Sequence, residues 1–452
     1  MVEFRAIRAI LLCEEECTML IDFSISNYRS FRDEAELSME AVGLSNYKES
    51  LIPYHSKSLL PVAAIYGKNA GGKSNLIRAM WLGVQFIRNA QRTQHEKAPV
   101  PVCPFALDSS SREKPTSFEY TYTVDGIKYR YGFSATKERI VNEYLYHAPN
   151  KQMALVFERN GQDFSFPSNS EKKKKEMIAE AVAENQLFFA VACTMNNAEC
   201  IKAMRWFREQ VFFSQDYADI PHMLLENQND PNILRAITDY AKAADLGIQD
   251  MKFEIHDKEI DPLTSLPNEI PDDVRAAIAN LMDVLNKSAS VNTASQHMSE
   301  VKAISLHNGM DASGTRTAFP LDLADESDGT TRLMALAPAI EQTLANGGVF
   351  VVDELDRGLH PLLVEYIVAK FQNPKSNING AQIIFTSHDT ELMNMELLRR
   401  DQLYFVDKAR GSGASELYSL SELSPRTTEN IRKGYLLGKY GAVPELDSQE
   451  VR

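Results

Sequence analysis

Two short stretches, far apart in the chain, carry the residues best suited to chemistry on phosphate. The first reads GKNAGGKS from Gly67 to Ser74; it follows the apolar run Pro61 to Tyr66 and leads into a helical pattern. Its glycines let the backbone curl until several N–H groups surround phosphate oxygens. Lys73 can reach the β- and γ-phosphates, and the hydroxyl of Ser74 can ligate Mg²⁺. The order strand, loop, helix therefore predicts a site for a nucleoside triphosphate, in preference to a glycine-rich turn without a ligand. The residues predicted to hold it are Gly67, Asn69, Gly71, Gly72, Lys73, Ser74 and Asn75.

The second stretch, Gly348 to Glu354, reads GVFVVDE and pairs a buried strand with two carboxylates at its end. Ligands bind beyond the carboxyl ends of the strands in open parallel sheets. Asp353 is predicted to hold Mg²⁺ through its hydration shell, and Glu354 to orient and deprotonate an attacking water. Adjacent residues at a strand end point in different directions, so one carboxylate can serve the metal and the other the water. The alternative is a strand that merely ends in acidic turn residues.

A histidine follows the next predicted strand. Gln382 to Phe385 is apolar and ends in Thr-Ser-His-Asp, and a helical pattern from Leu362 to Phe371 separates it from the acidic strand. Strand, helix and strand form a parallel crossover unit, which brings His388 to the same sheet edge as the two carboxylates. We therefore predict His388, with Glu354 and Lys73, to be catalytic.

A polar turn, Asp325 to Thr330, precedes a helical run that extends through Leu344. Small residues with a glycine at a helix start can bind an anion. The same residues could form an ordinary helix cap. The position of the turn just before the acidic strand favours the first interpretation.

The amino-acid composition is that of an ordinary globular protein. The excess of acidic residues argues against a protein that binds nucleic acid by charge alone. The 452 residues include 48 Lys and Arg against 62 Asp and Glu, a net charge of −14. A protein that coats nucleic acid usually has the opposite balance, so any DNA contact must use a local basic face or a partner. Five cysteines without a zinc or redox spacing favour a reducing cytosol. No apolar run approaches membrane-spanning length, so a cytoplasmic protein without a membrane partner is expected.

Around these stretches the pattern predicts an α/β protein interrupted by an insertion. Leu20 to Phe31 alternates as a strand does, and Phe118 to Val124 and Ile127 to Phe133 form a hairpin across Asp125-Gly126. The part from Ser168 to Ser299 is predicted to be mostly helical, with a helix over Asp272 to Leu285. The expected division is 1–18, an extension of uncertain order; 19–160, the first part of a nucleotide-binding domain; 161–299, the mainly helical insertion; and 300–452, the second part.

With these pieces placed, the chain resembles an ABC-type ATPase head of the SMC, RecF and OLD kind. Gly67 to Ser74 looks like Walker A, Val349 to Glu354 like Walker B, and Ser327 to Thr330 like the signature motif. Leu355 to His360 resembles the D-loop, His388 the switch histidine, and Asn27 to Phe31 the Asn-Phe-Arg-Ser entry of those families. The resemblance is greatest to AAA-type ATP-binding proteins of bacterial abortive-infection and phage-defence operons. It implies a P-loop NTPase fold with a mixed sheet, an antiparallel β subdomain and a helical insertion.

The resemblance also implies cofactors and partners. ATP and Mg²⁺ would be held between two copies in a homodimer or higher oligomer, with further nucleotide contacts from Arg29, Ser327, Gly329 and Asp356. The protein would be the sensor or switch of a defence complex that controls a nuclease or Toprim-like effector, with direct DNA contact left open. The alternatives are a DNA-repair or chromosome-maintenance ATPase and the nucleotide-binding subunit of a transporter. Three features argue against the transporter. One is the large insertion, and another is that no Q-loop glutamine can be identified, with Pro101 to Leu107 as its expected region. The third is Asp328, which stands where transporter signatures have glycine.

Overall fold

The computed structural model describes residues 18–44, 46–90, 98–150, 152–214, 224, 230–245, 247–260, 274, 296–426 and 429–444. The chain divides into two compact units: the first combines Met1–Asp216 with Ala339–Arg452, and the second is Tyr217–Pro338. Of the predicted N-terminal extension only Thr18 is described, and of the predicted helix over Asp272 to Leu285 only Val274, so both predictions lie outside the described residues. None of the helices in the described ranges is both long and apolar enough to cross a membrane.

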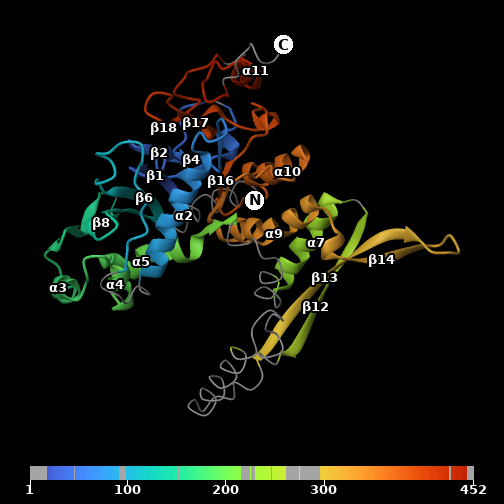
Figure 1. The fold of residues 1–452 in the computed structure, drawn as a ribbon, viewed down its shortest axis with the longest axis horizontal. Coiled ribbons are helices and arrows are strands. Elements are labelled where there is room, and N and C mark those ends of the chain that lie inside the picture. Colours follow the sequence, from blue (N-terminus) through green and yellow to red (C-terminus); the bar gives the residue numbers. More distant parts are fainter. Residues whose placement is uncertain are drawn as a thin grey trace, which may run out of the picture. The chain divides into compact units, whose positions relative to one another are not determined.

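A six-stranded sheet forms the centre of the first unit (Figure 1). Its strand order is β11-β15-β16-β5-β17-β18, and all neighbours are parallel except β17 and β18. All residues of β5, β15 and β16 are buried, which explains why these strands read as continuous apolar runs in the sequence. The strands are β5 (Val62–Tyr66), β11 (Val211–Phe213), β15 (Val349–Val352), β16 (Gln382–Thr386), β17 (Leu403–Lys408) and β18 (Ser415–Ser419).

The helices that follow these strands begin where the sequence predicts. Helix α2 (Lys73–Asn89) starts directly after the glycine-rich loop and contacts both the central sheet and strand β1. Helix α10 (Pro361–Gln372) has proline at its first position, where the missing N–H costs no hydrogen bond. Helix α9 (Asp328–Asn346) begins in the second unit and ends in the first. Trp81 of α2 packs against the hydrophobic core.

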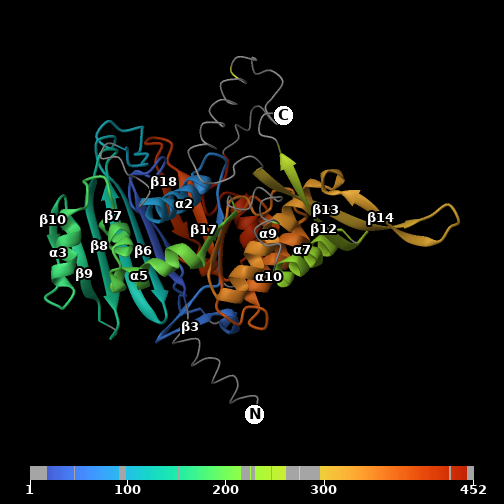
Figure 2. The same ribbon diagram turned by 90° about the horizontal axis from the view of Figure 1, so that it is seen from below.

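A second, fully antiparallel sheet of seven strands completes the first unit (Figure 2). Its order is β10-β9-β8-β7-β6-β1-β2. The predicted hairpin is confirmed: β6 and β7 meet across Asp125 and Gly126, whose φ angles of 50° and 71° are those of a tight two-residue turn. The strands are β1 (Leu20–Ser26), β2 (Ala35–Ser38), β6 (Thr116–Val124), β7 (Ile127–Ala135), β8 (Ile140–Ala148), β9 (Ala154–Asn160) and β10 (Asp163–Ser165). The first unit also holds the small hairpin β3 (Ile52–Tyr54) and β4 (Lys57–Leu59), and helix α11 (Ile431–Leu436).

The strand predicted over Leu20 to Phe31 is shorter in the structure. It ends at Ser26, and the chain then turns, with the N–H of Tyr28 donating to the carbonyl of Phe31 at 2.7 Å. Asn27 has a φ of 50°, a conformation that asparagine tolerates better than most residues. Its side-chain amide donates to the carbonyls of Ser111 and Lys114, which fixes the turn against a distant loop.

The predicted mainly helical insertion differs from the observed division. Helices α3 (Lys172–Glu180), α4 (Phe188–Thr194) and α5 (Ala198–Arg205) belong to the first unit, where α5 contacts β6. The second unit contains α7 (Pro231–Ala244) and a three-stranded antiparallel sheet of β12 (Ile248–Ile260), β13 (Gln296–Met310) and β14 (Arg316–Asp322). The helical prediction is therefore wrong for β12. Apolar Met251, Phe253 and Ile255 alternate there as in a strand, and the pairing partner follows only some forty residues later.

The lysine run of α3 is only partly a solvated helix face. Lys172 to Lys174 are not buried, but Lys175 is fully buried and contacts two oxygens. Its Nζ donates to the carbonyl of Val156 at 3.0 Å and to the carboxylate of Glu199 at 2.5 Å. Lys175 thus joins α3 to β9 and α5 and is unavailable for a phosphate backbone.

A buried charged group holds the antiparallel sheet against helix α4. Glu143 of β8 accepts hydrogen bonds from the N–H groups of Phe188 and Phe189 at 2.8 and 2.9 Å and from the hydroxyl of Tyr131 at 3.0 Å. The guanidinium of Arg159 lies 3.5 Å away, and both side chains of this pair are fully buried. Burial raises the pKa of Glu143, and Arg159 and the two amide donors oppose that rise. The carboxylate therefore caps the start of α4 and balances the buried arginine.

Replacing Glu143 by alanine should lower the free energy of unfolding by about 3–5 kcal/mol, because it leaves the charge of Arg159 and two amide donors buried without their partner. Urea unfolding followed by circular dichroism measures the change. The exposed Glu138 on the adjoining turn provides a matched control, and Glu138→Ala should be nearly neutral. A loss below about 1 kcal/mol for Glu143→Ala would show that the carboxylate is dispensable.

Candidate functional site

The register of the central sheet brings the predicted chemistry to one edge. Val352 of β15 pairs with Phe385 of β16, and Phe385 pairs with Ala64 of β5. The three strands therefore end at the same level, and the segments that follow them emerge side by side. Asp353, Thr386 and the glycine-rich loop after β5 meet there, as the crossover pattern predicts.

A cavity of about 510 Å³ opens at this edge. It is lined by Ser30, Lys68, Asn69, Ala70, Gly71, Gly72, Lys73, Ser74, Asn75, Glu354, His388 and Lys408. All of these residues lie in the first unit. Most of the predicted nucleotide contacts and both remote catalytic candidates, Glu354 and His388, thus face one space.

Lys73 is positioned at the base of the loop. Its side chain is buried, and its Nζ donates to the carbonyl of Gly67 at 2.7 Å and more weakly to that of Lys68 at 3.4 Å. Burial lowers the pKa of Lys73, and the nearby carboxylates Asp353 and Glu354 oppose that effect. A buried cation in a glycine-rich loop at the start of a helix is a suitable partner for phosphate oxygens.

Two glycines of the loop are required by the neighbouring strands. A Cβ on Gly67 would lie 2.3 Å from the carbonyl oxygen of Val406 in β17, and one on Gly72 would lie 2.6 Å from Oγ of Ser415 in β18. Gly72 also has a φ of 126°, which residues with a side chain rarely adopt. The loop can therefore fold tightly only because no side chain stands at either position.

The two side chains predicted to hold Mg²⁺, Ser74 and Asp353, lie next to each other, and Thr386 contacts the second of them. Oγ of Ser74 lies 3.1 Å from Oδ1 of Asp353, and Oγ1 of Thr386 lies 2.7 Å from the same oxygen. Hard oxygen donors on a short hydroxyl and a carboxylate are the ligands that Mg²⁺ prefers. The residues present thus fit the ion, with Ser74 and Asp353 as the groups that would hold it.

Thr386 also fixes the backbone of Glu354. The N–H of Glu354 donates to Oγ1 of Thr386 at 2.7 Å, and Glu354 has a φ of 53°. A residue other than glycine in this conformation is strained, which is common where an active site requires a particular direction for a side chain. The turn after β15 thereby directs one carboxylate toward Ser74 and the next into the cavity.

His388 is linked to the predicted D-loop through its backbone. Its N–H donates to Oδ2 of Asp356 at 3.1 Å, and its side chain lines the cavity. The other carboxylate oxygen of Asp356, Oδ1, is buried and has no hydrogen-bond partner among the residues that the structure describes. Asp356 itself does not line the cavity. Its observed contact is to the histidine loop, and its role as a nucleotide contact remains a prediction.

Three other predicted contacts are not among the residues that line this cavity. Arg29 does not line it; its guanidinium lies 5.8 Å from the ring centre of Tyr28, and the neighbouring Ser30 takes the position at the cavity. Ser327 and Gly329 belong to the second unit, where Oγ of Ser327 accepts the N–H of Thr330 at 3.1 Å. The turn before α9 therefore contains a helix cap, which was one of its two interpretations.

Three residues that support the site were not among the predicted site residues. Thr386 joins the metal group to Glu354, and Ser415 donates from Oγ to the carbonyl of Gly71 at 2.6 Å. Ser30 accepts from the amide of Asn75 at 2.9 Å. Thr386 follows the predicted strand two residues before His388, and Ser30 lies in the stretch Asn27 to Phe31 that resembles a family motif, so Ser415 alone of these three had no sequence signal. The contacts of Ser30 and Ser415 depend on strands distant in sequence.

Replacing Thr386 by valine keeps the shape of the side chain but removes both hydroxyl contacts. We expect ATP turnover to fall about 10–100-fold, as is typical when a residue that orients a metal ligand is lost. The concentration of Mg²⁺ needed for half-maximal turnover should rise, because Asp353 loses the hydroxyl that orients it. Thr386→Ser retains the hydroxyl and should behave like the wild type, whereas an unchanged Mg²⁺ dependence for valine would exclude this role.

Replacing Lys73 by alanine should weaken ATP binding about 10–100-fold, the equivalent of losing a charged hydrogen bond of about 1.5–3 kcal/mol. Titration with a fluorescent ATP analogue measures the affinity. Lys57→Ala, on the β3–β4 hairpin, removes an exposed lysine as a control. Undiminished affinity in Lys73→Ala, with an unchanged melting temperature, would contradict the assignment of the loop.

The chain is similar to several proteins of known structure. Among solved structures, the chain is similar to an SMC head bound to the C-winged helix domain of ScpA, at 12% identity and a TM-score of 0.38, with 89% of this chain and 97% of that chain covered. It is also similar to the SMC head domain from Thermotoga maritima, at 13% identity, a TM-score of 0.36 and coverage of 89% and 98%. The recombination mediator RecF matches at 12% identity, a TM-score of 0.36 and coverage of 89% and 99%. No relative among the curated proteins matches the chain.

A family match covers both motif stretches. It extends over residues 62–394, which is most of the chain and includes β5, the glycine-rich loop, β15 and β16. The predicted relationship to AAA-type ATP-binding proteins is thereby confirmed. The chain belongs to the family described as "AAA domain, putative AbiEii toxin, Type IV TA system".

Proposed function

We propose that this protein is an Mg²⁺-dependent ATPase that hydrolyses ATP to ADP and phosphate at the cavity beside the glycine-rich loop. The observation that supports it best is the link from Ser74 through Asp353 and Thr386 to the backbone of Glu354. These contacts support the proposal because they join, at one sheet edge, the glycine-rich loop, the pair that would hold the metal and the residue that would act as the base. Each is a component that phosphoryl transfer to water requires.

The residues around the cavity have different roles in the proposed reaction. Loop N–H groups and Lys73 hold the triphosphate and stabilise charge that develops on its oxygens. Mg²⁺, when bound, neutralises phosphate charge. Glu354 accepts the proton of the attacking water, and His388, which lines the same cavity, contacts the terminal phosphate.

The cavity requires a second copy of the chain to be complete. Lys73 and Ser74 of one protomer would face Ser327 and Gly329 of the other, so that two protomers enclose two ATP molecules. In a symmetric dimer both subunits use the same surface for contact. ATP would favour the closed dimer, because it contacts both copies only in that state. ATP would then be hydrolysed only when the dimer is closed, so the rate of turnover would reflect how much closed dimer is present. This property would suit a molecular switch.

Mixing two inactive variants tests the shared site. Lys73→Ala disables the loop, and Ser327→Arg blocks the opposing turn. In a mixed dimer one site carries both defects and the other carries none. Because half of the randomly formed dimers are mixed, turnover should recover to about one quarter of the wild-type value. If each protomer used its own Ser327, the mixture would stay as inactive as its parts.

Replacing Glu354 by glutamine should preserve ATP binding and slow turnover about 10²–10⁴-fold, because the general base is lost. The variant should also accumulate as an ATP-bound dimer, which native mass spectrometry measures. Glu365→Gln, an exposed position on α10, is the matched control. Normal turnover in Glu354→Gln would remove this residue from the role.

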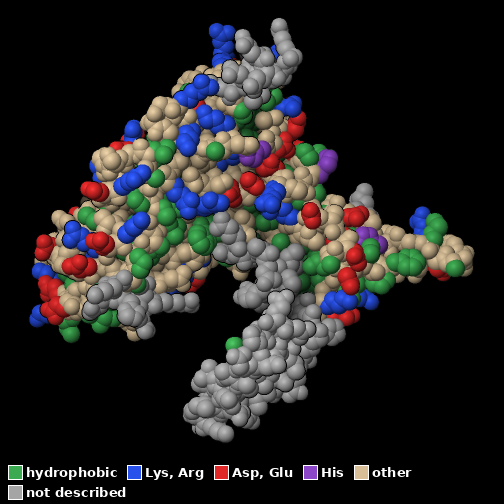
Figure 3. All heavy atoms as spheres, in the orientation of Figure 1, with side chains coloured by type: hydrophobic (Ala, Val, Ile, Leu, Met, Phe, Trp, Pro, Cys, Tyr) green, Lys and Arg blue, Asp and Glu red, His purple; other side chains and the backbone are tan. Residues whose placement is uncertain are grey.

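In the cell, this ATPase would act as the sensor or switch of a cytoplasmic anti-phage defence complex and control a nuclease or Toprim-like effector. The family description, which names an AbiEii toxin and a type IV toxin–antitoxin system, supports this setting. The net charge of −14, and basic side chains that are scattered among acidic ones on the described part of the face in Figure 3, favour a protein partner over a DNA-coating role. Co-purification of the native complex tests it: a nuclease partner supports the proposal, whereas DNA-stimulated turnover without a partner favours a repair ATPase of the RecF kind.

A further inference from the structure

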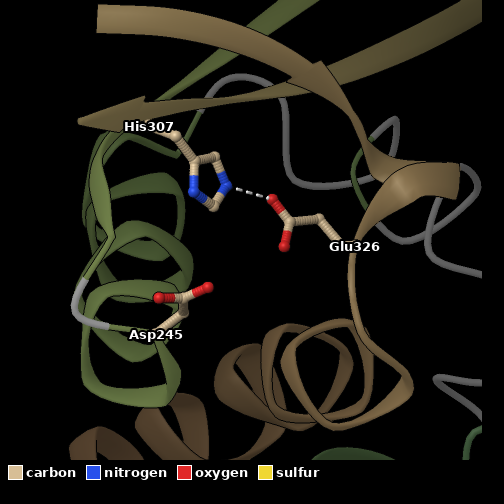
Figure 4. A group of neighbouring side chains, drawn as sticks. All are labelled: Asp245, His307 and Glu326. Atoms are coloured by element: carbon tan, nitrogen blue, oxygen red, sulfur yellow. Dashed lines mark hydrogen bonds and ion pairs between the residues drawn. The ribbon is translucent and has the colours of Figure 1, made fainter. Parts of the chain in front are cut away.

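A second group of side chains with metal-binding chemistry lies in the second unit, apart from the residues of the ATP cavity. Asp245 follows α7, His307 lies in β13, and Glu326 precedes α9. Figure 4 shows the three side chains pointing toward one another, with Nε2 of His307 2.7 Å from Oε1 of Glu326. One ligand atom from each residue lies within 4.8 Å of the other two.

The charges in this group are not balanced. The side chain of Glu326 is 4% exposed and that of His307 is 18% exposed. In the part of the chain that the structure describes, no Lys or Arg forms an ion pair with Asp245 or Glu326. Two carboxylates therefore lie near one imidazole, with the Glu326 side chain buried and Asp245 and His307 partly exposed. Buried carboxylates are costly unless they are paired or coordinate a metal, and a dication would supply the missing charge.

The ligand atoms are already held by neighbouring groups. Oγ of Ser305, two residues before His307 on β13, donates to Oε1 of Glu326. The N–H of Gly247 donates to Oδ1 of Asp245 at 2.7 Å. Hydrogen bonds of this kind orient the ligands in metal sites and strengthen binding. The three residues also come from three separate elements, so their convergence is a product of the tertiary fold.

We propose that Asp245, His307 and Glu326 bind a dication of the zinc class. Imidazole nitrogen with carboxylate oxygens suits zinc better than Mg²⁺ or Ca²⁺, which prefer oxygen donors alone. Three protein ligands with a water molecule in the fourth position form a familiar zinc geometry. Ligand atoms about 2.0–2.2 Å from zinc lie about 3.4 Å apart in a tetrahedron, so the His307–Glu326 contact would open by less than 1 Å.

The bound metal would hold the turn before α9. Glu326 directly precedes Ser327, whose hydroxyl caps the helix through Thr330. A cation that ties Glu326 to β13 and to the end of α7 would restrict the position of Ser327. This consequence rests on the proposed function, in which Ser327 faces the partner's ATP, whereas the metal site itself does not.

Zinc binding to the full-length protein tests the site. The protein is stripped with EDTA, returned to buffer with excess Mg²⁺ to occupy the Ser74 site, and titrated with Zn²⁺ by calorimetry. Bound metal is counted by elemental analysis after desalting. The wild type should bind one equivalent, and Zn²⁺ should raise its melting temperature. His307→Ala and Glu326→Gln should each bind zinc at least about tenfold more weakly and lose the thermal shift.

Two controls separate this result from other causes. His55→Ala removes an exposed histidine of the β3–β4 turn and should leave binding unchanged. Lys73→Ala should also keep its zinc, so a failure of the ATP site would not affect the result. Retention of a cooperative melt in EDTA by Glu326→Gln shows that the variant is folded. An absence of tight zinc in the wild type, or equal binding by His307→Ala and Glu326→Gln, would overturn the proposal.

Discussion

The site depends on three parallel strands ending at the same level. The pairing of Val352 with Phe385, and of Phe385 with Ala64, places Asp353, Thr386 and the glycine-rich loop next to one another. A strand rises about 3.3 Å per residue, so a slip of one residue would separate Ser74 from Asp353 by more than a hydrogen bond can span. It would also turn each side chain to the opposite face of the sheet. The buried, continuously apolar strands therefore maintain the geometry of the candidate site as well as the core.

Around this edge the chain contains a strained backbone conformation, a buried charge and close backbone contacts, which a purely structural sheet would not need. Glu354 holds a φ of 53°, and Lys73 is buried with its charge directed at backbone carbonyls. Gly67 and Gly72 approach β17 and β18 too closely for any side chain. Strain of this kind persists where the surrounding structure fixes it, and it is common at functional sites. Here β16, β17 and β18 are the elements that fix it, through Thr386, Val406 and Ser415.

The second unit has a different construction. Its long antiparallel pair, β12 and β13, stands where a helical insertion was predicted. Asp245, His307 and Glu326 converge near the end of this pair at which Ile248 pairs with His307, beside the turn that begins α9. That helix crosses from the second unit into the first at Pro338. The first residues of α9 therefore belong to the second unit and its last residues to the first.

The sequence by itself determined the elements whose signals are local. The glycine-rich loop, the acidic strand end and the Asp-Gly hairpin are each contained in a few consecutive residues, because their backbone requirements are local. Only the tertiary structure decided the contacts that join distant segments. Thr386 meets Glu354, and Ser415 meets Gly71, through strand pairing, and no spacing in the chain encodes it. The same holds for β12, whose partner strand is remote, and for His307, which becomes a candidate ligand only when α7, β13 and the turn before α9 converge.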